Sequence, residues 1–491
     1  MRGPAMHGRT ALLLLFLLAL LLPATAEAHQ RLLRTEPARD SAAASVPREL
    51  RLAFYEPVEL AFTRVELIGP DGETIALGEP RLDAPEVLVV PISGAMRVGG
   101  YTVRWATASR DGHPVRGEYG FSIAADAEGL AAAPDHTPGG EHAGAVTAPG
   151  RAPPPASHHP PPSATPSFDA DSPGYVAVRW ITFLALLGVI GAVAFALPVL
   201  GLAERGGLPA EGVLVADARR RAAALGLAAA ALLAVAALAR LYAQSLAMHG
   251  GGGALDAERL GAMLTRTVWG WGWMLQAAAA LVAAAGFALA RWGAGAGWAL
   301  AALAVLALAP SAGLSGHAAA MTGTVGTLAL VADALHVLAA GGWLGGLLVL
   351  MAAGVPAALR MGAEERGPAV AALVRAFSPA ALAFAAVLVA TGTFAAVVHV
   401  GSVEALLGSR YGTTLLVKLG VFLLVLAAGA YNYLRVRPAL GDDAGTARLR
   451  RSATVEIAVG AAVLLVTAVL VATSPPDRDA HAAPAAASEL R

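Results

Sequence analysis

Long apolar segments dominate the chain from residue 174 onward, and polar positions are confined to short stretches between them. A helix needs about 20 consecutive apolar residues to cross the hydrocarbon core of a bilayer, and about eight segments reach that length. Their centres fall near Leu187, Leu232, Ala280, Leu303, Ala340, Val387, Leu424 and Leu464. The pattern predicts an all-α polytopic membrane bundle of about eight transmembrane helices over residues 174–473, followed by an external tail at residues 474–491.

Residues 29–125 show a different periodicity, in which apolar and polar positions alternate over short runs. The alternation is clear at residues 50–54, 101–105 and 119–123, and turn sequences such as that at residues 70–72 separate the runs. A period of two places every second side chain on one face of a strand. Short strands divided by Gly/Pro turns predict an all-β sandwich with one core.

The first 28 residues read as a secretory signal peptide. Arginines precede an apolar run at residues 11–22, Pro23 breaks that run, and Ala26-Glu27-Ala28 supplies the small residues that precede a cleavage site. Cleavage after Ala28 would make His29 the first residue of the mature chain. An uncleaved anchor helix is the alternative interpretation.

Residues 126–173 form a Pro/Ala/His linker, with eleven prolines and almost no large apolar residues. Such a composition cannot bury a core. His136, His142, His158 and His159 lie in this linker. They could collect metal loosely, or they could be incidental residues of a spacer.

Composition and charge narrow the function classes. The chain is 56% hydrophobic and 14% charged, which is typical of a polytopic membrane protein, and its net charge of zero gives no basic surface for nucleic acid. It has no cysteine, so any metal must be held by His, Met, carboxylate or backbone groups.

Arginines cluster in alternate loops, for example at residues 219–221 and 448–451. The positive-inside rule then predicts a multi-pass protein of the bacterial cytoplasmic membrane, with the sandwich and the C-terminal tail outside the cytoplasm.

Histidines show the opposite bias, because none falls in a predicted inner loop. A mature N-terminal His29 could chelate a metal through its α-amine and its ring together. His113, in the sequence Asp111-Gly112-His113-Pro114, offers a third nitrogen, and Asp111 offers an oxygen. Nitrogen-rich sites of this kind suit Cu(II).

The sandwich segment resembles the periplasmic copper-binding CopC family. The resemblance rests on His29, on "LRLAFYEPVE" at residues 50–59 and on "YTVRWATASRDGHPVRGEYGFSI" at residues 101–123. It implies a cupredoxin-like, immunoglobulin-like β-sandwich whose Cu(II) ligands are His29, Asp111 and His113, with Glu56 at an acidic position near the metal. Some family members also have a methionine-rich Cu(I) loop. Met96 is the single methionine of this segment, so we expect a site for Cu(II) alone.

In the membrane half, Asp333 and His336 stand three residues apart and therefore share a helix face, which Trp343 continues. His336 is expected about 14 Å below the outer end of its helix. Ionisable groups at such depth usually line a pathway or bind something. Structural roles compete: His336 could bond a neighbouring helix, and Asp333 could pair with Arg240 or Lys418.

Other candidates for a copper pathway lie near the outer ends of the spans. They are His317, Met321, Met248 and His249. Because methionine favours the reduced ion, Cu(I) is a candidate cargo of the membrane domain.

Residues 174–473 resemble the CopD family of copper-resistance membrane proteins. The pieces that carry the resemblance are "SGHAAA" at 315–320, "DALHVLAAGGWLGGL" at 333–347, "RAFSP" at 375–379, "YGTTLLVKLG" at 411–420, "YNYLRVRP" at 431–438 and Glu456. The resemblance implies copper uptake across the inner membrane.

The sequence therefore predicts a copper-homeostasis protein without catalytic activity, whose partners are copper ions, the lipid bilayer and other periplasmic copper carriers. Two other classes remain open. An N-terminal histidine on a β-sandwich also serves oxidative copper enzymes, and histidines in apolar helices can ligate haem in redox membrane proteins. Haem ligation usually needs two facing histidines, and His336 alone is clearly within a span.

Overall fold

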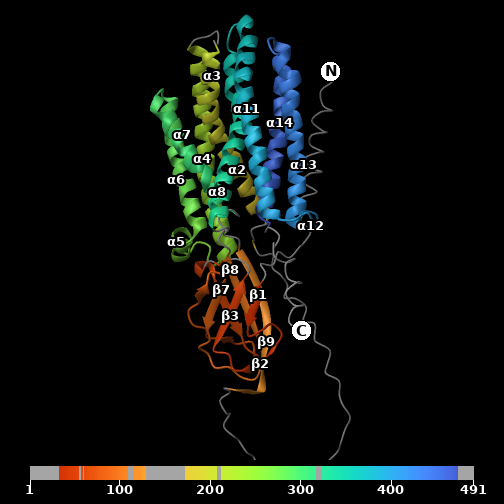
Figure 1. The fold of residues 1–491 in the computed structure, drawn as a ribbon. Helices are drawn as coiled ribbons and strands as arrows, with labels where there is room; N and C mark the ends of the chain where they lie inside the picture. The colour runs from red at the N-terminus through yellow and green to blue at the C-terminus, as the bar shows by residue number, and fades with distance from the viewer. Residues whose placement is uncertain are drawn as a thin grey trace, which may run out of the picture.

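The computed structural model describes residues 32–54, 57–58, 60–108, 114–128, 168, 172–206, 212–316 and 323–473. A β-sandwich lies against one end of a long helical bundle (Figure 1). We call this end of the bundle the sandwich end and the opposite one the far end. The predicted fold class, an all-β sandwich followed by a membrane-type helical bundle, is confirmed.

Two sheets form the sandwich. The first is four-stranded, in the order β1-β3-β7-β6, and the second is five-stranded, in the order β2-β9-β8-β4-β5. The strands are β1 (Leu32–Glu36), β2 (Ala42–Ser45), β3 (Glu49–Phe54), β4 (Arg64–Ile68), β5 (Thr74–Ile75), β6 (Arg81–Ala84), β7 (Val87–Pro91), β8 (Gly99–Ala108) and β9 (Pro114–Glu128), with a short 3-10 helix η1 (Leu60–Phe62) before β4.

The predicted alternation appears directly in strand β3. Leu50, Leu52 and Phe54 are buried between the sheets, and Phe54 meets Trp105 edge to face with ring centroids 5.0 Å apart. Glu49, which precedes Leu50, and Arg51, which follows it, point outward. This is the period-two pattern that a half-buried strand requires.

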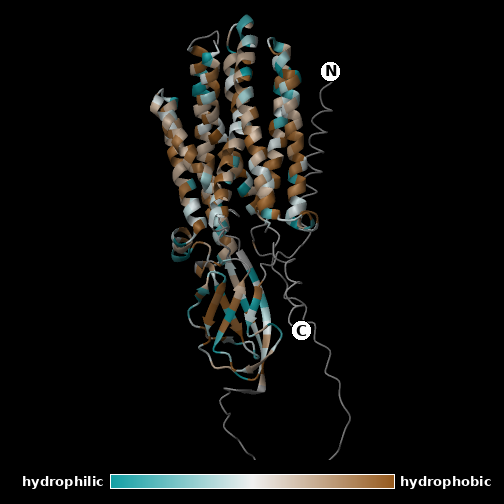
Figure 2. Ribbon diagram, viewed as in Figure 1, coloured by the Kyte–Doolittle hydropathy of each residue, from teal (hydrophilic) through white to brown (hydrophobic). Residues whose placement is uncertain are grey.

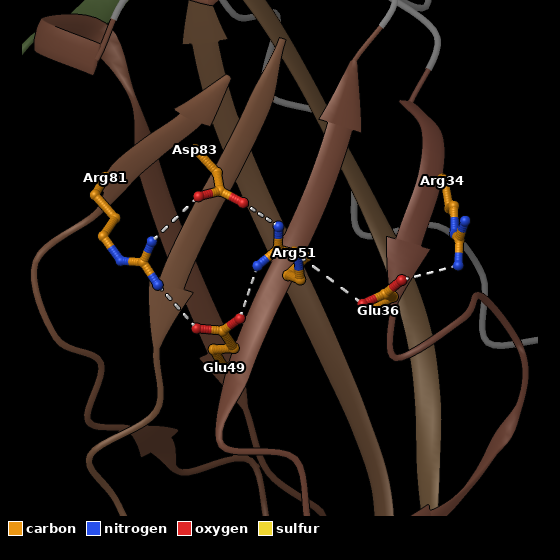
Figure 3. A network of polar contacts seen from close by, with 6 residues as sticks. All are labelled: Arg34, Glu36, Glu49, Arg51, Arg81 and Asp83. Carbon is orange, nitrogen blue, oxygen red and sulfur yellow. Dashed lines mark hydrogen bonds and ion pairs between the residues drawn. The ribbon is translucent and has the colours of Figure 1, made fainter. Parts of the chain in front are cut away.

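A network of charged side chains covers the outer face of the four-stranded sheet (Figure 3). Arg51 lies at its centre and donates hydrogen bonds to Glu49, at 3.0 Å, and to Asp83. Arg81 donates to the other oxygen of Glu49 at 3.1 Å, and Glu36 extends the network toward β1. Because these cross-strand partners are partly or largely exposed, they keep this face solvated and add little stability.

Eight helices of the described part are long and apolar enough to cross a membrane, as the sequence predicts. Figure 2 shows that hydrophobic residues predominate along them. The helical elements are α2 (Pro173–Ala194), η2 (Phe195–Val199), α3 (Leu200–Arg205), α4 (Val213–His249), α5 (Ala257–Arg266), α6 (Val268–Arg291), α7 (Gly295–Leu314), α8 (Gly323–Ala340), η4 (Gly341–Gly345), α9 (Gly346–Val349), η5 (Leu350–Gly354), α10 (Val355–Ala358), α11 (Ala363–Val400), α12 (Val403–Gly408), α13 (Arg410–Tyr431), η6 (Asn432–Val436), η7 (Arg437–Ala439) and α14 (Asp443–Leu470).

Four of the short segments, η2, η4, η5 and η6, are π-helical turns that interrupt longer helices. Segment η4 has the sequence GGWLG and crosses α2 very closely. A Cβ atom on Gly345 would lie 2.0 Å from the backbone oxygen of Leu187, so only glycine fits there. Single π-turns within α-helices are frequent at functional sites.

The sandwich rests on the bundle through η1 and β9. Phe62 is buried and packs with Met263 of α5 and Trp269 of α6. The Arg116 guanidinium donates to the Ala247 carbonyl at the end of α4, 2.5 Å away. An apolar anchor and a polar contact thus join the two parts of the chain.

Candidate functional site

The predicted soluble copper ligands His29, Glu56, Asp111 and His113 lie outside the described residues, as do His317 and Met321. The strand ends next to the soluble ligands are described. β8 ends at Ala108, which pairs with Pro114 at the start of β9.

The end of the sandwich that carries this hairpin faces the bundle. The hydroxyl groups of Thr63 and Thr107 are hydrogen-bonded at 2.8 Å, which ties the residue after η1 to the end of β8. Phe62 precedes Thr63 and is the residue that packs on α5 and α6. The first described residue of β1, Leu32, pairs with Phe54 at the end of β3.

Met248 and His249 lie at the last turn of α4, beside this contact. Met248 packs on the cluster that surrounds Phe62, and the His249 ring lies 6.5 Å from the Phe62 ring. His249 Nδ1 is 3.3 Å from the Ser245 hydroxyl. The structure therefore places this Met-His pair at the junction between sandwich and bundle.

Asp333 and His336 lie together on α8, within the bundle. His336 follows the start of α8 by thirteen residues, about 20 Å of helix. Two glycines make room for these side chains. A Cβ on Gly313 would lie 2.9 Å from Asp333 Oδ2, and one on Gly392 would lie 3.4 Å from His336 Cε1.

The hydrogen bonds of His336 identify which ring nitrogen is free. His336 Nδ1 is 3.0 Å from the hydroxyl of Thr391 on α11, and that hydroxyl donates its own proton to the Val387 carbonyl at 2.7 Å. With the Thr391 proton placed on Val387, Thr391 accepts from His336, and on this basis we assign the imidazole proton to Nδ1. The lone pair of Nε2 then has no partner among the described residues, and a neutral imidazole of this kind can bind a metal.

Lys418 on α13 lies in the neighbourhood of Asp333, but no ion pair joins the two residues. The carboxylate makes no hydrogen bond to another described residue. Arg240, the other partner considered, instead donates to Gln276 at 3.2 Å and lies 3.5 Å from the Ser315 carbonyl. Among the described residues, Asp333 is therefore ion-paired with neither of the two partners that the sequence suggested.

Sequence reasoning did not foresee a second polar cluster in the membrane domain. Glu456 of α14 is 3% exposed and accepts a hydrogen bond from Trp343 Nε1 at 3.1 Å and one from Asn432 Nδ2 at 2.6 Å. Trp343 follows His336 by seven residues but contacts α14, whereas His336 contacts α11. Glu456 and Asn432 both fall in segments that carry the CopD resemblance, but their spacing of 24 residues gives no signal of contact.

The described residues contain no group of three or more His, Asp or Glu side chains that could hold a metal ion. Asp333 and His336 supply one oxygen and one nitrogen. A metal held there would need further ligands from residues outside the described part or from solvent.

Three family models match the chain. They are the CopC domain at residues 32–124, the copper resistance protein D-like N-terminal domain at residues 169–327, and copper resistance protein D at residues 371–470. Their order along the chain is that of the sandwich followed by the bundle.

Individual relatives agree with these matches. The chain is 28% identical to the copper transport protein CutJ of Bacillus subtilis over 483 residues, which cover 95% of this chain and 78% of the relative. The sandwich is 35% identical to protein YobA of Escherichia coli over 98 residues, covering 20% of this chain and 79% of YobA. Among solved structures, the chain is similar to PcoC, a copper resistance protein of Escherichia coli, with 27% identity, 19% of this chain and 98% of that chain covered, and a TM-score of 0.18.

Proposed function

Because the chain belongs to the copper resistance families, with a CopC domain followed by a CopD membrane domain, we propose that it binds Cu(II) outside the cytoplasm and carries copper inward across the membrane. In this proposal His29, Asp111 and His113 bind the ion on the sandwich, with Glu56 nearby. The sandwich and the C-terminal tail lie outside the cytoplasm, and other periplasmic carriers deliver copper to the sandwich. No catalytic step is assigned.

The observation that best supports the proposal is the way the sandwich rests on the bundle. The end that carries the β8–β9 hairpin, whose connection contains Asp111 and His113, is tied through Thr63 to the residue that packs on α5 and α6. Copper released there would start at the sandwich end of the bundle. A carrier on a free tether would have to diffuse to that end each time.

Within the bundle, we assign the next position to His336. Its Nε2 lone pair is free among the described residues, and Nδ1–H is held by Thr391. Metal-binding histidines usually have their second nitrogen fixed in this way. We assign His317, Asp333 and Met321 to the same pathway, and Met248 and His249 stand at the junction.

Cellular copper content tests the proposal. His336→Ala should leave Cu(II) binding by the sandwich unchanged and lower copper accumulation, because it removes a ligand of the bundle. His113→Ala should weaken Cu(II) binding and also lower accumulation. Since the two sites act in series, the double variant should be little worse than the more severe single variant.

The matched control is His142→Ala in the linker, which should accumulate copper normally. Normal accumulation in His336→Ala cells would remove this histidine from the pathway and leave it a structural role. Accumulation above that of the parent would reverse the direction and make the protein an exporter.

A further inference from the structure

Glu456 is a membrane-buried carboxylate without a counter-ion. Its hydrogen bonds come from the neutral donors Trp343 and Asn432, and no ion pair joins it to another described residue. Transfer of an isolated carboxylate into a low-dielectric interior is so costly that the group normally binds a cation or a proton.

The elements packed on α14 bring no cation to this carboxylate. They are α13, η6, α2, α9 and α11. The basic residues of the spans that contain them include Lys418 on α13, Arg435 on η6, Arg179 on α2 and Arg375 on α11, and none forms an ion pair with Glu456. The charge of an ionised Glu456 is therefore uncompensated within the described residues.

Asn432 suits either protonation state of Glu456. As assigned, its Nδ2 donates to the carboxylate, and its buried Oδ1 has no partner. A half-turn of the amide would place Oδ1 on Glu456 Oε2, where it could accept from a carboxylic acid. Amide orientation is an assignment, and the 2.6 Å separation is shorter than the usual N–H···O range but normal for O–H···O.

Helix geometry brings these groups together from three spans. Trp343 lies in the π-turn η4, Asn432 opens the π-turn η6, and Gly429 lies one turn before Asn432. A Cβ on Gly429 would approach Glu456 Oε1 to 3.3 Å and Trp343 Cζ2 to 3.2 Å. Both donors of Glu456 thus sit on irregular turns of the kind found at functional sites.

We propose that Glu456 is a proton-binding site that couples copper passage to proton movement. This inference rests on the proposed function. A copper ion entering the bundle favours the ionised carboxylate, because opposite charges attract strongly in a low-dielectric interior. Glu456 Oε2 then releases its proton toward the far side, and it takes up a new proton from the sandwich end once the ion has left. One proton thereby crosses the bundle in the same direction as each copper ion.

The far end of the same two helices offers a route for the proton. A cavity of about 610 Å³ is lined by Tyr431, Arg435 and Arg448. Tyr431 directly precedes Asn432, and Arg448 lies about two helical turns before Glu456 on α14. Water in this cavity would exchange the proton with the far side, and its arginines would repel a copper ion from the same opening.

The test uses the full-length protein in lipid vesicles loaded with a pH-sensitive dye. Copper entry by the parent protein should be accompanied by a pH change inside the vesicle. Glu456→Gln should lose that change, because an amide cannot exchange the proton, although it keeps the size of the acid and can still bond Trp343 and Asn432. The control is Glu364→Gln, an exposed carboxylate at the start of α11, which should retain the pH change.

Infrared difference spectroscopy separates failure of this inference from failure of the transport proposal. Titration of the full-length protein with base should remove a carboxylic-acid band that Glu456→Gln lacks from the start, whether or not the protein carries copper. Its presence without copper entry would refute the transport proposal and keep the proton site. Absence of the band, or an unchanged pH signal in Glu456→Gln vesicles that take up copper, would overturn the inference.

Discussion

At the scale of single residues, the function depends on which side-chain atoms have no hydrogen-bond partner on a neighbouring helix. Sequence spacing correctly placed Asp333 and His336 on one helix, but it could not show that Thr391 fixes the protonated nitrogen of His336. Thr391 lies 55 residues away along the chain. Only packing of α11 on α8 brings the hydroxyl to the ring and leaves Nε2 open.

Thr391→Val should therefore reduce copper accumulation while leaving the fold intact. The substitution keeps the shape of the side chain but removes the acceptor of the His336 Nδ1 proton. Loss of such a supporting hydrogen bond typically lowers metal affinity or activity about 10-fold to 100-fold. The measurement is cellular copper content at equal protein level, and Thr391→Ser should restore it.

Thr393→Val is the matched control for this prediction. Its hydroxyl donates to the Val389 carbonyl on the same helix at 2.8 Å and is exposed. It touches no part of the His336 site, so its removal should leave copper accumulation unchanged. Equal losses in the two variants would mean that α11 responds to any lost hydroxyl, and the role of Thr391 as an orienting residue would be wrong.

At the scale of elements, the sequence predicted the strands and helices whose residue pattern is set by their immediate surroundings. Strand β3 alternates because one of its faces is buried, and the spans are long and apolar because lipid surrounds them. Residues 50–54 and the eight helices were therefore predictable. The pairing order of the strands and the π-turns η4 and η6 were not, because they depend on contacts with distant segments such as that of Gly345 with Leu187.

The close crossing of α2 and η4 gives a prediction about stability. Gly345→Ala would force a methyl group against the Leu187 carbonyl, and the two helices would have to separate. Overpacking of this kind costs about 1–3 kcal/mol. The midpoint of thermal unfolding in detergent should therefore fall.

Gly420→Ala controls for the general effect of adding a methyl group to a helix of the bundle. Gly420 lies within α13, and a Cβ there would meet nothing within 4 Å. Alanine favours a helix over glycine by about 1 kcal/mol, so this variant should unfold at the same temperature or a higher one. A Gly345→Ala protein as stable as Gly420→Ala would show that α2 and η4 do not cross as closely as the structure has them.

At the scale of the whole molecule, the sandwich is attached to the bundle in two ways. Sequence reasoning anticipated only a tether, because a linker with the composition of residues 126–173 is expected to span about 35–40 Å as a flexible chain. The structure adds a specific contact through Phe62 and Arg116. Phe62 ends a short apolar run with Leu60 and Ala61, which is equally expected of a residue in the sandwich core, so this contact could not be foreseen.

Distance measurements between spin labels can show whether this contact holds in solution. The chain has no native cysteine, so Val98→Cys on the sandwich and Leu255→Cys on the bundle, both exposed, would carry the only two labels. The docked sandwich should give a narrow distance distribution.

Phe62→Asp should broaden this distribution, because burying Phe62 contributes about 1.5–3 kcal/mol and a carboxylate in that apolar cluster would be costly. Leu82→Asp, an exposed position on β6, should leave the distribution narrow. A broad distribution already present in the parent protein would mean that the sandwich moves freely on its tether, and copper would then have to reach the bundle by diffusion of the whole sandwich.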